Sequence, residues 1–109
     1  MSRLAVVTYD LQPPYDHATA NKVMEGAGFS RFRTASSGEL HQLPNTTWMA
    51  DLADAASGPA RDRIADALQL RFAAAGLNAK ILVVVADDWA WGLRQSVGLS
   101  TAYRSSYLG

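Results

Sequence analysis

The chain has 109 residues, of which 49% are hydrophobic and 18% are charged, a composition that fits one globular domain and excludes a disordered tail. Ten basic residues balance ten acidic residues, which argues against a polybasic protein that binds nucleic acid by neutralising many phosphates. Cysteine is absent, which excludes disulfides, thiolate zinc sites and cysteine nucleophiles.

The first part of the chain predicts a strand followed by a helix. Residues 4–9 are a run of strand formers closed by Asp10, and Pro13-Pro14 end the strand. This apolar run is too short for a signal peptide or a membrane span, so we expect a cytoplasmic protein without a membrane partner. Asp16 is the predicted N-cap of a helix over residues 17–27, because its carboxylate can accept hydrogen bonds from the first-turn amides.

The rest of the chain predicts three strands and one helix. Residues 29–35 alternate between two faces, which is typical of a strand, and this strand is expected to continue irregularly to Leu43. The next strand, helix and strand are predicted over residues 46–52, 59–75 and 81–86.

The resulting order β-α-β-β-α-β predicts an α+β fold, the ferredoxin-like sandwich. In that fold the strands lie antiparallel in the order 4-1-3-2, counted along the chain, with both helices on one face of the sheet. We assign residues 1–92 to this domain and residues 93–109 to a C-terminal segment.

The first and last predicted strands are apolar on both faces, at residues 4–9 and 81–85. One sheet face packs on the helices, and the other needs a cover, because a large exposed apolar patch is typical of a partner surface. We expect this cover to be a second copy of the chain, in a homodimer packed through the open sheet face with residues 93–109 on the partner subunit. The alternative is that residues 93–109 fold back over their own sheet.

Three short motifs occur near the ends of predicted strands. They are Tyr9-Asp10-Leu11, Asn45-Thr46-Thr47-Trp48 and Asp88-Trp89-Ala90-Trp91-Gly92. With them, the chain resembles, over about residues 4–92, the small ferredoxin-like proteins related to CRISPR-associated endoribonuclease two and the VapD-type toxins, including phage and bacterial members outside CRISPR loci. The resemblance implies a homodimer with a sheet-to-sheet interface. It also implies a metal-dependent phosphodiesterase site at the two-fold axis, built from the aspartate at the end of the first strand of each subunit.

Asp10 occupies that position and is the expected catalytic and metal-binding residue. A carboxylate at the end of an apolar strand can hold Mg²⁺, which prefers oxygen ligands, or it can simply begin a turn. The third predicted strand runs antiparallel to the first, so Asn45 and Thr46 are expected beside Asp10, where they would orient a phosphate. His17 follows the same loop and is either a general acid or base there or an exposed helix residue.

The predicted strand over residues 29–35 places Arg31 and Arg33 on one face. Two guanidinium groups suit contacts with the phosphates of a nucleic acid, and they equally suit an edge strand that charge keeps from aggregating. The remaining acidic candidates are expected at the end of the sheet far from Asp10, and they are Asp51, Asp54, Asp87 and Asp88.

These features predict a metal-dependent endonuclease that cleaves RNA or DNA phosphodiester bonds, with Mg²⁺ at the paired Asp10 carboxylates and Arg31, Arg33, Asn45 and Thr46 in contact with nucleic acid. Two alternatives stay open. One is a non-catalytic dimeric scaffold or regulator that binds a protein or nucleic-acid partner, as in toxin–antitoxin or phage-defence systems. The other is a dimer that senses a small metabolite at its interface.

Overall fold

The computed structural model describes residues 3–53 and 57–98, which contain five strands and two helices. In chain order they are β1 (Arg3–Leu11), α1 (His17–Gly26), β2 (Phe32–Thr34), β3 (Leu40–Gln42), β4 (Thr47–Leu52), α2 (Ser57–Ala74) and β5 (Ala79–Ala86). The predicted α+β class is confirmed, and β1, α1, β4, α2 and β5 each overlap the element that was predicted there.

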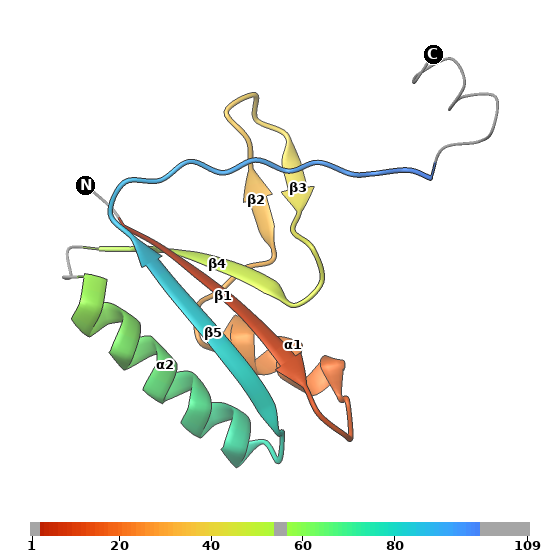
Figure 1. Ribbon diagram of the computed structural model, residues 1–109, viewed down its shortest axis with the longest axis vertical. Helices are drawn as coiled ribbons and strands as arrows, with labels where there is room; N and C mark the ends of the chain where they lie inside the picture. Colours follow the sequence, from red (N-terminus) through yellow and green to blue (C-terminus); the bar gives the residue numbers. More distant parts are fainter. Residues whose placement is uncertain (1–2, 54–56, 99–109) are drawn as a thin grey trace.

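β1 is the central strand of a three-stranded sheet with the order β4-β1-β5, and it is antiparallel to both neighbours (Figure 1). Val7 of β1 lies opposite Trp48 of β4 and Val83 of β5. Because side chains alternate between the two faces of a strand, these three residues share one face, and their neighbours along each strand share the other.

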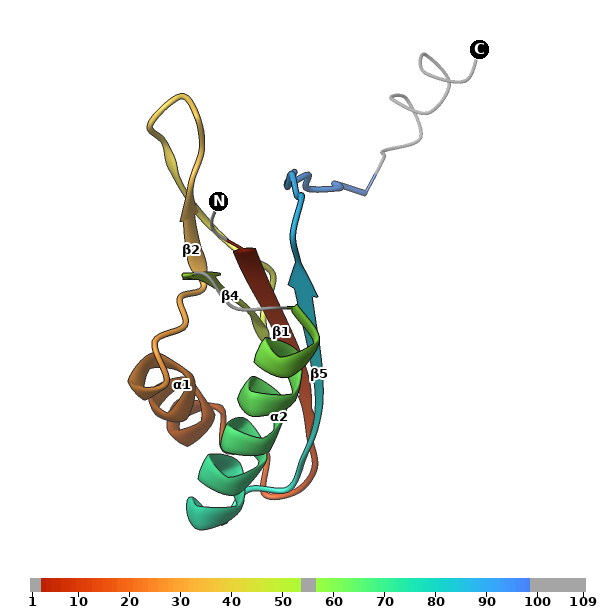
Figure 2. The ribbon, with the colours of Figure 1, turned by 90° about the vertical axis from the view of Figure 1, so that its left-hand side faces the viewer.

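Both helices pack on the face of the sheet that carries Val7 (Figure 2). The largest fully buried side chains come from β1, β4, α1 and α2, and they are Trp48, Phe72, Met24, Leu68 and Val7. On α2 the apolar residues Ile64, Leu68 and Phe72 follow one another at helical spacing and form an apolar ridge, in which Leu68 and Phe72 are 1% and 2% exposed and Ile64 packs beside them. The core therefore lies between the sheet and the helix layer.

The segment predicted as one strand from residue 29 toward Leu43 is instead a single bridge followed by a hairpin. Ser30 and Met49 of β4 exchange backbone hydrogen bonds of 3.0 and 2.9 Å. The Ser30 hydroxyl then bonds to the backbone of Phe32, a local pattern that competes with the sheet ladder and turns the chain away from it. β2 and β3 form their own antiparallel pair, which reverses at Gly38 with φ +90°.

This correction changes the sheet order. The predicted order was 4-1-3-2, counted over the four predicted strands. Its first three strands correspond to β5, β1 and β4 of the observed sheet, and where the second predicted strand was expected beside β4 the structure has only the Ser30–Met49 bridge. The arrangement is compatible with a ferredoxin-like fold, and the four-stranded sheet stays a prediction.

Asp16 caps α1 as predicted. Its Oδ1 accepts a hydrogen bond from the Thr19 amide at 3.1 Å, and its Oδ2 accepts one from the Thr19 hydroxyl at 2.6 Å. The hydroxyl bond and then the amide bond lower the pKa of the Asp16 carboxyl below its ordinary value of 3.8. The cap's contribution to stability is therefore complete above the unfolded-state pKa and is lost as the pH falls through the folded-state pKa.

We expect Asp16→Ala to lower the thermal unfolding midpoint at neutral pH, because two first-turn donors lose their acceptor. The difference in unfolding midpoint between wild type and variant should narrow as the pH falls below 3.8, since protonation of Asp16 removes the same contribution from the wild type. Thermal unfolding of the two proteins, followed by circular dichroism at several pH values in the acid range, measures this difference. A difference that stays constant through the acid range would contradict the role of the carboxylate.

Candidate functional site

Asp10 lies inside β1, on the face of the sheet turned away from the helices. Its neighbours Tyr9 and Leu11 are each 5% exposed and belong to the core, whereas Asp10 is exposed. β1 continues to Leu11, so the alternative in which Asp10 begins a turn is wrong. Asp10 lies opposite Lys80 of β5 in the antiparallel register, so an amine and a carboxylate share this end of the face.

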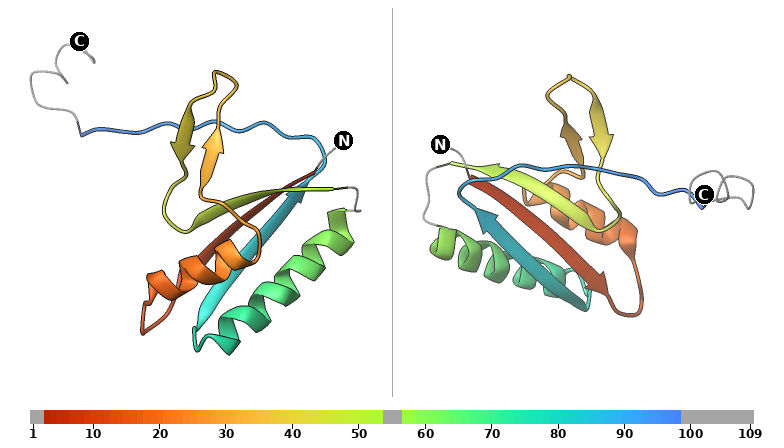
Figure 3. Two further views of the ribbon diagram at one scale, coloured as in Figure 1. Left: turned by 180° about the vertical axis from the view of Figure 1, so that it is seen from behind. Right: turned by 45° about the horizontal axis from the view of Figure 1, so that its top comes forward.

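The face that carries Asp10 is covered at one end only (Figure 3). At the far end of β1, Leu4 is 3% exposed, whereas Leu82 and Val84 on β5 are 59% and 48% exposed. Residues 93–98 leave these two side chains uncovered, and the rest of the predicted C-terminal segment, residues 99–109, lies outside the described residues. We call the surface around Asp10, Lys80, Leu82 and Val84 the open face.

The opposite face of the same sheet end holds a small cavity of about 200 Å³ between the end of β1, the start of α1 and the loop before β4. Its six lining residues are Tyr9, His17, Asn21, Arg31, Asn45 and Thr46, and we call it the Arg31 cavity. Three of the predicted nucleic-acid contacts, Arg31, Asn45 and Thr46, are thus brought together. Asp10 is not among the lining residues, because its side chain projects to the other side of the sheet.

Arg31 is held on the indole of Trp48. Its guanidinium carbon lies 5.6 Å from the ring centroid, a distance at which a cation is attracted by the ring face. Arg31 Nε and Trp48 Nε1 are both buried without a hydrogen-bond partner in the described part of the chain. Arg31 forms no ion pair there either, so its charge is not neutralised by a protein carboxylate.

Tyr9 and Asn21 form the inner wall of the Arg31 cavity. The Tyr9 hydroxyl donates a hydrogen bond of 3.5 Å to Asn21 Oδ1. Burial raises the pKa of the Tyr9 phenol, and the N–H of Trp48 and the charge of Arg31 oppose that rise only in part. The phenol therefore stays a neutral donor near pH 7. Neither residue was predicted, although the spacing of His17 and Asn21 on one helix face was a usable signal.

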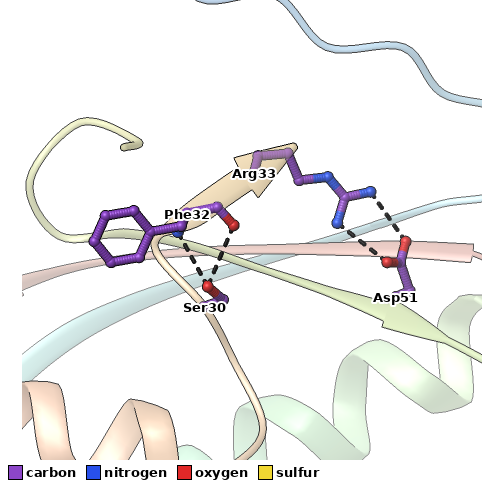
Figure 4. A network of polar contacts seen from close by, with 4 residues as sticks. All are labelled: Ser30, Phe32, Arg33 and Asp51. Carbon is purple, nitrogen blue, oxygen red and sulfur yellow. Dashed lines mark hydrogen bonds and ion pairs between the residues drawn. The ribbon is translucent and has the colours of Figure 1, made fainter. Parts of the chain in front are cut away.

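Arg33 does not act with Arg31, because its guanidinium reaches the other end of the sheet (Figure 4). It donates two hydrogen bonds of 3.0 and 3.2 Å to the carboxylate of Asp51 on β4. Its guanidinium carbon also lies 5.1 Å from the ring centroid of Trp89, which follows β5. Arg33 therefore joins the hairpin and the segment after β5 to the sheet. Its contact with nucleic acid stays a prediction.

Asp51 and Asp87 lie where the antiparallel register predicted, and Asp54 lies outside the described residues. Asp51 is opposite Leu4 at the far end of β1 from Asp10, and Asp87 forms an ion pair with Arg3 at the same end. Within residues 3–53 and 57–98, no three His, Cys, Asp or Glu side chains come close enough to hold a metal ion. Within the described residues, Asp10 is therefore not part of a cluster of three such side chains.

A scan of protein-family models with this sequence found no match, and neither did a search of curated proteins. Neither helix in the described residues combines the length and the apolar character needed to cross a bilayer.

Proposed function

We propose that the protein is a homodimer, packed through the open face of its sheet, that cleaves RNA or DNA phosphodiester bonds at paired Asp10 carboxylates with the help of Mg²⁺. We include in this proposal the ferredoxin-like fold and the relationship to the endoribonuclease-two and VapD-type proteins. The observation that carries the proposal is the position of Asp10, which is exposed on the same face as the uncovered Leu82 and Val84.

The open face provides the reason for a dimer. Leu82 and Val84 are half exposed on a strand whose other face is packed against the core, and covering them removes apolar surface from water. In a two-fold dimer both subunits use the same surface patch, so an interface that includes Asp10 contains two Asp10 side chains, one from each subunit. A two-fold axis near this end of β1 brings the two carboxylates to one site.

A dimer improves the donor set for Mg²⁺. The ion keeps several waters and is commonly held by one or two carboxylates together with a substrate phosphate, and a dimer brings two Asp10 carboxylates where one chain brings one. When bound, the ion neutralises charge on the attacked phosphate and lowers the pKa of a coordinated water. Lys80, opposite Asp10, is the cation placed to hold a phosphate of the substrate, a role that the sequence prediction gave to arginines.

Asp10→Asn tests the assignment, because it removes the charge and keeps the shape. We expect cleavage of end-labelled RNA or DNA in Mg²⁺ to fall by at least about 100-fold, with the sedimentation coefficient of the dimer unchanged. EDTA should abolish cleavage by the wild type. Asp66→Asn, at an exposed carboxylate on α2, is the matched control and should cleave like the wild type. Cleavage by Asp10→Asn at the wild-type rate would show that the site is elsewhere.

A second candidate is a dimeric scaffold without catalytic activity. It is favoured by the isolation of Asp10, whose cross-strand neighbour is the amine of Lys80 and not another carboxylate. In the same assay it predicts a dimer in which neither the wild type nor Asp10→Asn cleaves RNA or DNA, with or without Mg²⁺.

A further inference from the structure

The Arg31 cavity carries a charge and a set of hydrogen-bond donors that the proposed cleavage site does not use. It is built within one chain, and it lies on the helix side of the sheet, whereas Asp10 lies on the open face. A ligand in this cavity therefore needs neither the dimer nor a metal ion.

We infer that the Arg31 cavity binds a phosphoryl group, either as free phosphate or as the terminal phosphate of an oligonucleotide. None of the six described residues that line it is acidic, and within residues 3–53 and 57–98 the positive charge of Arg31 has no carboxylate partner. Stacking on Trp48 holds the guanidinium in place, so little side-chain freedom remains to be lost when an anion binds.

The surrounding groups supply the donors that phosphate oxygens require. Because Asn21 Oδ1 already accepts from the Tyr9 hydroxyl, the NH₂ group of Asn21 keeps both of its hydrogens for a ligand. Asn45 also lines the cavity, and its side-chain NH₂ supplies further donors, whereas the Thr46 hydroxyl already donates its hydrogen to the Asn45 carbonyl at 2.6 Å. Thr46 has φ +65°, an uncommon conformation for a β-branched residue, so the fold holds this side of the cavity in a strained backbone.

The size of the cavity limits the ligand. At about 200 Å³ it is smaller than the sites of roughly 300–1,000 Å³ that enclose whole drug-sized molecules. A phosphate group fits such a volume, while an attached nucleoside would extend outside it. Binding is therefore expected to depend on the phosphate and to be insensitive to the base.

The test is a titration of ¹⁵N-labelled protein in EDTA with inorganic phosphate, followed by the Thr46 amide and Trp48 indole signals. We expect saturable shifts in the wild type. Arg31→Gln should weaken binding at least about tenfold, because a charge-assisted contact is lost. Arg63→Gln removes an exposed arginine of α2 and should bind phosphate like the wild type.

Asn45→Asp provides a second variant in case Arg31→Gln disturbs the packing of Trp48. Asn45 is exposed, and the new carboxylate adds a repulsive charge without removing volume, so the same loss of at least about tenfold is expected. Shifts that stay linear with phosphate concentration, or equal affinities in wild type, Arg31→Gln and Asn45→Asp, would overturn the inference.

A pair of dinucleotides, one with a 5′-phosphate and one with a 5′-hydroxyl, distinguishes the two sources of the phosphoryl group. Tighter binding of the phosphorylated dinucleotide than of free phosphate, with no binding of its hydroxyl twin, supports a terminal phosphate as the ligand. Equal affinities for the phosphorylated dinucleotide and free phosphate support free phosphate. These results are independent of cleavage, so a failure of Asp10→Asn to act as proposed leaves them unchanged.

Discussion

Leu82→Glu is expected to convert the dimer into a monomer. Leu82 is 59% exposed on the open face, where β5 places it opposite Thr8 and near Asp10. In the proposed dimer the new carboxylate would be buried in the interface near the paired Asp10 carboxylates, at a cost of several kcal/mol. We expect the dimer dissociation constant to rise at least about 100-fold, which sedimentation velocity over a range of concentrations measures.

Leu70→Glu is the matched control for this variant. Leu70 is 71% exposed on α2, so the same substitution changes the same charge and volume away from the open face. It should leave the dimer intact, and the circular dichroism spectra of both variants should match the wild type. If the wild type sediments as a monomer at high concentration, or if both glutamate variants remain dimeric, the proposed interface is wrong. Loss of cleavage in Leu82→Glu alone would further support a site shared between subunits.

Phe72→Ala is expected to remove most of the stability of the domain. Phe72 is 2% exposed and joins α2 to the sheet through Tyr9, with ring centroids 5.3 Å apart. Truncating such a side chain leaves a cavity and typically costs about 3–5 kcal/mol, a large part of the roughly 5–15 kcal/mol by which domains are stable. Urea unfolding followed by circular dichroism measures this loss.

Leu70→Ala, two residues away on the same helix, separates loss of packing from a change in helix propensity. Its side chain is exposed, so its free energy of unfolding should stay within about 0.5 kcal/mol of the wild type. If Phe72→Ala unfolded at the same urea concentration as Leu70→Ala, α2 would not be packed on the sheet as described.

The regular elements were predictable from the pattern of their apolar residues. Leu68 and Phe72 repeat at the helical spacing, and residues 81–86 form a continuous apolar run. The hairpin was not predictable in this way, because alternation from residue 29 to 35 is the same for one long strand and for a short strand that leaves the sheet. The side-chain bonds of Ser30 to the backbone of Phe32 and the positive φ of Gly38 decide between them.

In the candidate site, too, some features were predictable from the sequence and others required the structure. Alternation along the strand places Asp10 on the face opposite to its apolar neighbours Tyr9 and Leu11. The sequence order predicted Asn45 and Thr46 beside Asp10, and the register of Thr8 with Thr47 brings them only to the same end of β1. That they lie on the side of the sheet opposite to Asp10, with Arg31 and Asn21, depends on how the loop before β4 and α1 pack.

The sequence by itself determined the α+β class, the cap of α1 and the apolar ridge of α2, because each depends on residues close together in the chain. Only the tertiary structure decided that Lys80 faces Asp10, that Arg33 pairs with Asp51 and that Arg31 lines a separate cavity. These pairs join residues from 18 to 70 positions apart, and their contacts depend on strand register and on the packing of the hairpin. Register and packing come from many weak contacts acting together, which no local spacing encodes.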